Sequence, residues 1–390
     1  MLDFLQDKSE KKVEYIELIY DLIFVYLVSQ NGQLLHNIED GFITTGAYLT
    51  YLASSVVILQ IWYFSSLLIN RYGSGTLREQ LGLFVNMYLL YFMADGIRVD
   101  WGPTYLRYNL AWALILINLA VQYLLRLRFG TPLSPRERHH ARLQVIILLT
   151  ESFIVLITIP VYHLTGLAFA PWAAVFGFAA PILTRRVDAQ VPVDFSHMSE
   201  RVMLYVVFTF GEMILGITGY FASEFSGMTV YYSLMAFLLV AGLFSGYGYY
   251  YDRLVDRSLV TTGTGYMLLH ILLILALNNI TAALEFMRQP RVFLIPKTIF
   301  LVLSLLVYFL CLLGTQRFAV KHIGRGNRFY WMLGASFAAY CLLIALSYRR
   351  PYISMAISVL FIYLQLFALK RAGVDREPAL QDGNQTEELL

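Results

Sequence analysis

The segment from Glu14 to Leu35 is apolar enough to cross a membrane, yet it carries two acids, Glu17 and Asp21. These acids are four residues apart, so in a helix they share one face. Removing a carboxylate from water is costly, and acids in membrane helices almost always face a protein interior or a wet cavity. This face of the helix must therefore point inward, and other helices must supply its surroundings.

The composition extends this conclusion to the whole chain of 390 residues. Apolar residues make up 58% and charged residues only 14%, against about 25% charged in soluble domains. A helix needs about 20 apolar residues to cross a hydrocarbon core of about 30 Å. Twelve stretches supply that length, so the sequence predicts an all-α, polytopic membrane protein. They lie near residues 14–35, 45–69, 79–97, 105–127, 142–163, 166–184, 201–221, 229–250, 264–286, 292–313, 328–348 and 351–370.

The basic residues predict the orientation of these helices, because cytoplasmic loops are enriched in Lys and Arg. With the N-terminus in the cytoplasm, only seven of the 29 Lys and Arg residues fall on the outer side. Both termini are therefore expected in the cytoplasm, and residues 1–12 do not have the pattern of a cleaved leader. The acidic segment 372–390 is expected to be a disordered tail. The seven outer residues are Arg98, Arg107, Arg288, Arg291, Lys297, Arg349 and Arg350.

The two halves of the chain resemble each other, which predicts an internal repeat. Glu17 and Glu200 occupy matching positions at two helix starts, 183 residues apart. An aromatic cluster followed by a polar residue and an arginine ends two further stretches, at Arg71 and Arg253, 182 residues apart. Each copy would contain six helices, an even number, so both copies would enter the membrane from the same side and be parallel. A transport site is then expected between the copies. Shared ancestry without a transport site is the alternative. The predicted repeats are residues 1–190 and 191–371.

Two segments resemble the signatures of a known family. ELIYDLIFVYLVSQ runs from Glu17 to Gln30, and HMSERVMLYVVFTFGEM runs from His197 to Met213. They are similar to the two signature segments of the bacterial low temperature requirement A family, which consists of polytopic inner-membrane proteins named for a role in growth in the cold. The resemblance covers essentially the whole hydrophobic region. Relatives usually have a serine where this chain has Met213, so a hydroxyl beside the glutamate is missing. The resemblance points to Glu17, Asp21, Gln30, His197, Glu200, Arg201, Gly211 and Glu212.

Three acids are expected at similar depth, which makes them candidates for one site. Asp21, Glu151 and Glu212 lie roughly 14 to 17 Å into their helices, counted from the basic residue that precedes each one. In a core of about 30 Å this depth is close to the midplane. Buried carboxyl groups can hold protons at ordinary pH, so the functional interpretation is a site for a coupling ion or proton. The structural alternative is that these acids hydrogen-bond between helices.

Charged residues nearer the helix starts have simpler interpretations. Glu17 is expected to form an ion pair with Arg71 or Arg201. His139 and His140 are expected in a basic loop between two helices, where water would solvate them.

His197 and Glu200 form an H-x-x-E pattern at a helix start. A metal site with three protein ligands would need further His or Cys partners, so no metal is predicted. An acid in the first turn suits the helix dipole, and Ser196 is a plausible N-cap, so the pattern is explained without a ligand.

Polar side chains also follow the stretch 264–286, where His270, Asn278, Asn279 and Glu285 occur. Such groups either contact a substrate or tie helices together, and the pattern leaves both open. No Gly-rich phosphate loop, Ser/His/Asp arrangement or cysteine nucleophile is visible in the sequence. We therefore expect neither an enzyme nor a cofactor.

Together these features predict a membrane protein that moves a small solute or ion, with proton coupling as one option, by rocking one repeat against the other. The alternative is a membrane factor that binds lipid or a partner protein without transport, with structural acids. The lipid bilayer and a solute or proton are the expected partners, and nucleic acid is not. Glu17, Asp21, Glu151, Glu212 and Asn278 form the predicted site, with Asp21 and Glu212 as principal ion or proton sites, supported by Gln30, His197, Glu200, Arg201 and His270.

Overall fold

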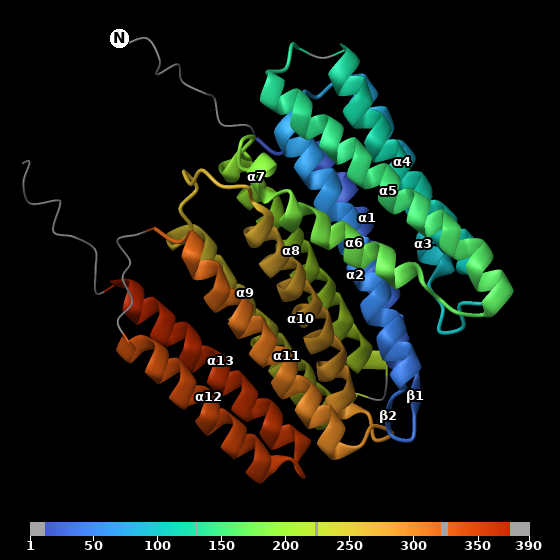
Figure 1. Ribbon diagram of the computed structural model, residues 1–390. Coiled ribbons are helices and arrows are strands. Elements are labelled where there is room, and N and C mark those ends of the chain that lie inside the picture. Colours follow the sequence, from blue (N-terminus) through green and yellow to red (C-terminus); the bar gives the residue numbers. More distant parts are fainter. Residues whose placement is uncertain (1–11, 130, 223–224, 321–326, 375–390) are drawn as a thin grey trace, which may run out of the picture. The chain divides into compact units, whose positions relative to one another are not determined.

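A computed structural model describes residues 12–129, 131–222, 225–320 and 327–374, which are largely helical (Figure 1). These residues form thirteen α-helices, three short 3-10 helices and two short strands. The α-helices are α1 (Tyr15–Gly32), α2 (Thr45–Tyr72), α3 (Leu77–Gly96), α4 (Tyr105–Phe129), α5 (Pro135–Thr165), α6 (Ala170–Leu183), α7 (Arg185–Asp188), α8 (Phe195–Ile217), α9 (Gly227–Arg253), α10 (Thr264–Arg288), α11 (Leu294–Gly314), α12 (Asn327–Ser347) and α13 (Pro351–Val374). The 3-10 helices are η1 (Gln33–His36), η2 (Thr218–Ala222) and η3 (Thr315–Phe318), and the strands are β1 (Ile38–Glu39) and β2 (Phe42–Ile43).

Each of the twelve predicted stretches overlaps one long helix, and the four-residue α7 is the additional one. Within the described ranges, nine helices are long and apolar enough to cross a membrane, and α6 is apolar but shorter. Helices α1 and α3 are not among these ten, and both contain charged and other polar residues. The chain is therefore a multi-pass membrane protein, whereas the arrangement of twelve spans in two repeats stays a prediction.

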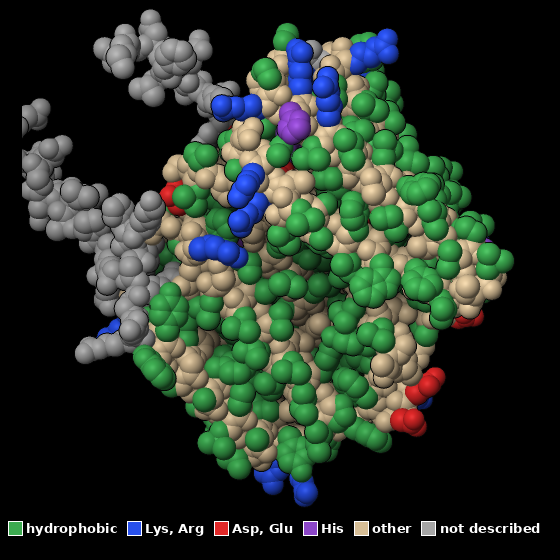
Figure 2. All heavy atoms as spheres, viewed as in Figure 1, with side chains coloured by type: hydrophobic (Ala, Val, Ile, Leu, Met, Phe, Trp, Pro, Cys, Tyr) green, Lys and Arg blue, Asp and Glu red, His purple; other side chains and the backbone are tan. Residues whose placement is uncertain are grey.

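The outward faces of the long helices carry large apolar side chains. On α5, for example, Ile146, Phe153 and Ile157 are all exposed. Figure 2 shows hydrophobic side chains spread over α4 and α5, with basic side chains gathered at the end where α5 begins. An apolar belt of this kind is what a lipid environment requires.

The helices group into two compact units. Unit 1 comprises 1–216 and 257–311, which contain α1 to α8, α10 and most of α11. Unit 2 comprises 217–256 and 312–390, which contain α9, α12 and α13. All the predicted site residues belong to unit 1.

Helix α2 is the core helix of unit 1, and α1, α4, α6 and α10 pack on it. Its buried small residues include Ser54, Ser55 and Ser65, which let neighbouring helices approach closely. The hydroxyls of Ser54 and Ser65 donate to carbonyls of α2 itself, at 2.9 and 3.0 Å, so their burial leaves no donor unsatisfied.

In unit 2, helix α13 packs on both α9 and α12. Gly242 of α9 lies against the side chain of Ile362, and a larger residue there would push α13 away. Between α12 and α13, the rings of Tyr340 and Phe361 stack at 4.4 Å between centroids.

Strands β1 and β2 form a small antiparallel hairpin between α1 and α2, which the all-α prediction did not include. Its turn residues Asp40 and Gly41 both have positive φ, at 47° and 80°, as a two-residue type I′ turn requires. Gly41 also accepts a hydrogen bond from the backbone of Phe293, at 2.8 Å, which ties the hairpin to the start of α11.

Helix α5 begins earlier than predicted, at Pro135, because Ser134 and Glu137 form a complete capping box. The predicted solvated loop is thereby shortened, and His140 lies within the helix and is fully buried. The prediction that water solvates His140 is therefore wrong. At the other end of the chain, α13 continues to Val374, and the rest of the predicted acidic tail lies outside the described residues, as do residues 1–11.

Candidate functional site

The two acids of α1 face the interior of unit 1. Glu17 is 2% exposed and Asp21 is fully buried. In contrast, Ile19 and Leu22, on other faces of the same helix, are 47% and 48% exposed. The inward face predicted from the four-residue spacing is therefore confirmed.

Arg201 of α8 is the cation that faces both acids. Its Nε and Nη2 donate to the two carboxylate oxygens of Asp21, at 3.1 and 2.8 Å. Its Nη1 lies 3.1 Å from Oε2 of Glu17. Arg201 is only 2% exposed, so this is a buried ion network and not a surface pair. Of the two partners predicted for Glu17, Arg201 is the one the structure shows.

His197, one turn before Arg201 on α8, also contacts Glu17, with Nε2 at 3.3 Å from Oε1. Its other nitrogen, Nδ1, lies 3.0 Å from Nδ2 of Asn70 on α2. The Asn70 amide is oriented by the backbone of Asp194, because its Oδ1 accepts from the Asp194 N–H and its Nδ2 donates to the Asp194 carbonyl, both at 2.9 Å. Nδ1 of His197 therefore accepts a hydrogen bond, which fits a neutral imidazole with its proton on Nε2.

We call Glu17, Asp21, His197 and Arg201 the acid cluster. It contains two carboxylates and one guanidinium, and the hydrogen bonds of His197 fit a neutral ring. Counted over these four residues alone, and with both acids ionised, the acid cluster carries one more negative than positive charge. A buried net charge is costly, so this arrangement favours the uptake of one proton or one cation.

Aromatic side chains cover the Asp21 end of the acid cluster. Nε1 of Trp62 donates to Oδ1 of Asp21 at 2.9 Å. The Trp62 ring lies 4.7 Å from that of Tyr205, measured between centroids, and both are fully buried. Asp21 therefore accepts three hydrogen bonds in surroundings that exclude water.

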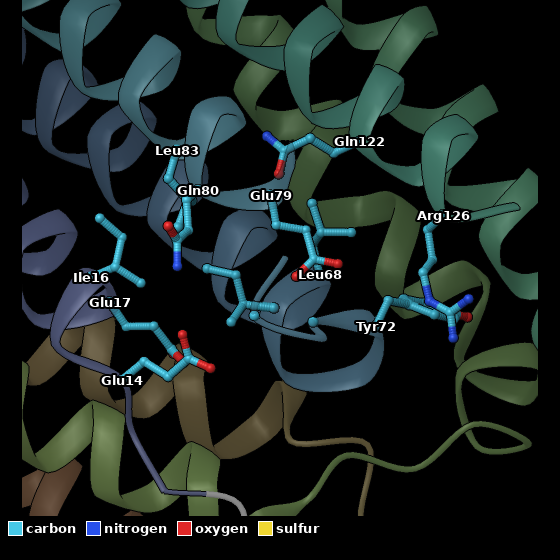
Figure 3. Close-up of a pocket in the computed structure, with 13 residues that line it drawn as sticks. Glu14, Ile16, Glu17, Leu68, Tyr72, Glu79, Gln80, Leu83, Gln122 and Arg126 are labelled. Carbon is cyan, nitrogen blue, oxygen red and sulfur yellow. The ribbon is translucent and has the colours of Figure 1, made fainter. Parts of the chain in front are cut away.

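A small pocket reaches the Glu17 end of the acid cluster from the side where α1 begins (Figure 3). Its volume of about 40 Å³ is enough for a few water molecules. Glu14, Glu17 and Glu79 line it together with Gln122 and Arg126, and Figure 3 shows Arg126 well away from Glu14 and Glu17. Three carboxylates against one guanidinium make this pocket a suitable entrance for protons or cations.

Glu212 lies further along α8 and is half-buried. Its Oε1 accepts a hydrogen bond from the hydroxyl of Ser29 on α1. Contacts between α1 and α8 keep a nearly constant sequence separation, 180 residues for Asp21 with Arg201 and 183 for Ser29 with Glu212. The two helices therefore run in the same direction, and their interface carries both Asp21 and Glu212.

Glu151 of α5 lies apart from the acid cluster and is fully buried. Both of its oxygens have no hydrogen-bond partner among the described residues. Its Oε2 and the Nε2 of Gln60 both lie against Gly177 of α6, where a side chain would collide with them. Within the same ranges, Asp21, Glu151 and Glu212 make no hydrogen bond to one another.

The remaining predicted residues have varied surroundings. Gln30 is exposed, and Glu200 is half-buried. Asn278 is half-buried, with no hydrogen-bond partner for its Nδ2 in the part of the chain that is described. His270 is fully buried, and its Nδ1 lies 2.8 Å from the Tyr266 carbonyl one turn earlier.

Arg71, the other predicted partner of Glu17, belongs to a second network. Its Nη1 lies 3.4 Å from Oδ1 of Asp188 on α7, and the same oxygen accepts from Nε2 of His140 at 2.9 Å. Burial by itself raises the pKa of Asp188, but the hydrogen bond from His140 and the charge of Arg71 outweigh it and hold that pKa below its ordinary value. The hydroxyl of Tyr72 forms a hydrogen bond with the other ring nitrogen of His140, Nδ1, at 2.7 Å.

The start of α8 differs from the prediction in one detail. The helix begins at Phe195, and the side chain of Asp194 accepts from the His197 N–H at 3.1 Å, so Asp194 is the N-cap instead of Ser196. Among the described residues, no group of three or more His, Cys, Asp or Glu side chains is placed to hold a metal ion.

Sequence reasoning missed Trp62 and Asn70, which contact Asp21 and His197 from α2. Trp62 belongs to the aromatic cluster that precedes Arg71, and Asn70 is the polar residue directly before Arg71, and neither position has a spacing that relates it to α1 or α8. The position of Asn70 one residue before Arg71, at the end of an apolar stretch, was the one available signal.

Comparison with known families adds one match. The model of the family described as "Bacterial low temperature requirement A protein (LtrA)" matches residues 12–372, nearly the whole chain. The matched range contains the acid cluster, Glu151 and Glu212. No curated protein and no solved structure matches the chain.

Proposed function

This chain belongs to the bacterial low temperature requirement A family, and we propose that it transports a small solute or ion, coupled to the binding of a proton or cation by the buried acids of α1 and α8. In this proposal it lies in the inner membrane with both termini in the cytoplasm. It has no catalytic role.

The meeting of two buried carboxylates with one guanidinium is the observation that carries this proposal. Two buried carboxylates face one guanidinium, and the Asn70 amide favours a neutral His197. A purely structural ion pair would balance its charges, since each unbalanced buried charge lowers stability. A proton or cation that binds and leaves would alternately balance and unbalance the acid cluster, which is what a coupled transporter requires.

A route for that charge follows the interface of α1 and α8. The acidic pocket gives access to Glu17, and Asp21 lies one turn further along α1. Ser29, which holds Glu212, is eight residues beyond Asp21, about 12 Å along the helix axis. We assign Asp21 and Glu212 as the principal sites, with Glu151 and Asn278 assisting.

The proposal includes the twelve-span arrangement in two parallel repeats, residues 1–190 and 191–371, that rock against each other. Three observations support it. The contacts of α1 with α8 keep a separation of 180 to 183 residues, close to the repeat length. An arginine lies in the last turn of both α2 and α9, at Arg71 and Arg253, and α6 and α13 both have a proline in the first turn.

Proton flux into proteoliposomes tests the proposal. The purified protein is reconstituted with a trapped pH-sensitive dye, and an inside-negative potential drives protons inward. We expect flux above protein-free vesicles, and a loss of at least about tenfold in Asp21→Asn and in Glu212→Gln. Glu39→Gln, at an exposed position of β1, should leave flux unchanged. Unchanged flux in both site variants would remove those residues from the mechanism.

A second candidate is a membrane factor that binds lipid or a partner protein without transport, with structural acids. The three hydrogen bonds that Asp21 accepts favour it, because they satisfy that carboxylate without any ligand. Thermal unfolding separates the candidates. A lower melting temperature in Glu212→Gln, with flux per folded molecule unchanged, supports the structural role.

A further inference from the structure

Helices α3 and α4 form a hairpin in unit 1 whose two ends differ in charge (Figure 1). Where α3 ends and α4 begins, Arg98 and Arg107 both form ion pairs with Asp95, which offsets part of their charge. At the other end, which is predicted to be cytoplasmic, Arg78 of α3 and Arg128 of α4 are both exposed. Within the described ranges, neither of these two arginines forms an ion pair with an acid.

The guanidinium groups of Arg78 and Arg128 lie against the same aromatic ring. Their Cζ atoms are 4.7 and 5.4 Å from the centroid of the Phe129 ring, and Phe129 is 55% exposed. The acid next to Arg78 in sequence, Glu79, is engaged elsewhere, because its two oxygens accept from the N–H and the hydroxyl of Ser74, both at 2.8 Å. Two like charges beside one ring repel each other, and an anion bound to both would offset that repulsion.

The contact face between α3 and α4 is marked by two pairs of residues. Nδ2 of Asn118 donates to Oδ1 of Asn86 at 2.7 Å, and a side chain at Gly82 would collide with that of Gln122. From one pair to the other, the α3 residue number falls by four while the α4 number rises by four. The two helices are therefore antiparallel.

Each helix carries a stripe of exposed side chains that begins with its arginine and continues with apolar residues. The stripes are Arg78, Leu81 and Val85 on α3, and Arg128, Leu124 and Val121 on α4. Intervals of three and four residues keep each stripe on one face of its helix. The four apolar side chains are 42% to 55% exposed.

The two stripes lie on the same side of the hairpin. Leu81 directly precedes the contact residue Gly82, and Val121 directly precedes the contact residue Gln122. One position corresponds to a rotation of about 100° around the helix axis. Because the helices are antiparallel, the same rotation turns both stripes toward the same side. The six residues of the stripes therefore form one surface, which we call the α3–α4 surface, with two guanidinium groups at one end and apolar side chains along the rest.

We propose that the α3–α4 surface binds an anionic phospholipid, with the phosphate at Arg78 and Arg128 and the acyl chains along the apolar residues. A guanidinium can donate two parallel hydrogen bonds to a phosphate, and basic groups at the ends of membrane helices attract anionic lipids. The apolar part of the surface favours a lipid over a soluble anion, which would leave that part uncovered. Neither arginine lines the acidic pocket beside Glu17, and the proposal does not depend on transport.

Native mass spectrometry of the full-length protein in detergent tests the proposal. Phosphatidylglycerol and phosphatidylcholine with identical acyl chains are titrated separately, and their dissociation constants are compared. Phosphatidylglycerol carries a net negative charge, so we expect it to bind at least about tenfold more tightly. Inorganic phosphate, added as a soluble competitor, should not displace it.

Two double variants locate the binding. Arg78→Gln combined with Arg128→Gln should weaken the binding of phosphatidylglycerol at least about tenfold and leave that of phosphatidylcholine unchanged. Arg98→Gln combined with Arg107→Gln removes the same number of positive charges from the opposite end of the hairpin and should have no effect. All four side chains are exposed, so both double variants should fold, and their melting temperatures check this.

The proposal is overturned if the folded wild-type protein binds the two lipids with equal affinity. It is also overturned if the Arg78 and Arg128 double variant binds phosphatidylglycerol as the wild type does, or if the control double variant loses as much affinity. Displacement of the lipid by inorganic phosphate would likewise overturn it, because the ligand would then be a soluble anion.

Discussion

Asp21 and Glu151 are both fully buried acids of unit 1, yet their surroundings are opposite. Asp21 accepts two hydrogen bonds from Arg201 and one from Trp62. Glu151 has neither a cation nor a hydrogen-bond donor at its oxygens within the described part of the chain. The surroundings of Asp21 stabilise an ionised carboxylate, whereas those of Glu151 favour a neutral acid.

The difference shows that burial alone does not tell what an acid does in a membrane helix. An acid that is hydrogen-bonded to a cation on another helix contributes to holding the two helices together, and removal of either partner leaves a charge behind. A neutral acid contributes little to that attachment and is free to change its protonation state when its surroundings change. Substitutions of residues around Asp21 and around Glu151 therefore test whether the two acids differ in their contribution to stability.

Removal of Arg201 should have the largest effect. In Arg201→Met, two carboxylates stay buried without the guanidinium, and we expect a loss of about 3 to 5 kcal/mol in the free energy of unfolding. Unfolding of the purified protein, followed by circular dichroism, measures it. Arg98→Met, at a side chain that is 62% exposed, is the control. A loss below about 1 kcal/mol would mean that Arg201 does not stabilise the acid cluster.

Replacement of Asp21 and of Glu151 by the corresponding amide should change the free energy of unfolding by unequal amounts. Asp21→Asn loses hydrogen bonds to a charged partner and should lower stability by about 1.5 to 3 kcal/mol. Glu151→Gln replaces a neutral acid by an amide of similar shape, so we expect a change below about 1 kcal/mol. The same unfolding measurement compares them at neutral pH. Equal losses, or the reverse order, would contradict the assignment of charge states.

The space around Glu151 gives a smaller, steric test. In Gly177→Ala the added methyl group would collide with Gln60 and Glu151, and we expect a loss of about 1 to 3 kcal/mol. At Gly211 of α8 an added methyl group has open space, so Gly211→Ala is the matched control and should not destabilise. A loss at Gly211 as large as that at Gly177 would show that the effect is not steric.

The smallest expected effect on stability concerns the half-buried acid Glu285, which forms an ion pair with His36. Its hydrogen bond to His36, joined by its negative charge, raises the pKa of His36 above the ordinary value of 6.5 even though burial opposes this. The pair therefore stabilises the fold fully below pH 6.5, and this contribution is lost as the pH rises through the folded-state pKa.

Both side chains are about one-third exposed, so we expect less than about 1 kcal/mol from this pair. Subtraction of the unfolding free energies of Glu285→Gln from those of the wild type, between pH 5 and pH 9, measures it. A difference that grows with pH would have the wrong sign.

Local spacing predicted much of the fold. The four-residue interval between Glu17 and Asp21 predicted their shared inward face, and apolar length predicted the position of each long helix. The sequence predicted Arg71 or Arg201 as the ion-pair partner of Glu17, and the structure shows Arg201. These features depend on neighbouring residues or on the scarcity of charges in a membrane segment, and both are visible in a sequence.

The environments of the two acids could not be predicted in the same way. Asp21 and Glu151 each stand in an apolar run, and only packing shows that one meets Arg201 and the other meets Gly177. His140 was assigned to a loop because charged neighbours dominate that segment, although the capping box of α5 encloses it in a helix. Whether Asp21, Glu151 and Glu212 serve one transport process stays a prediction.

The carboxamide of Asn70 has a consequence for His197 that reaches beyond their hydrogen bond. An amide presents a donor and an acceptor in one plane, and both are engaged by the backbone of Asp194, so the side chain cannot rotate to present oxygen to the imidazole. The tautomer of a ring on α8 is thus selected by a residue of α2. Nδ2 of Asn70 thereby determines that the proton of His197 is on Nε2, the nitrogen that faces Glu17.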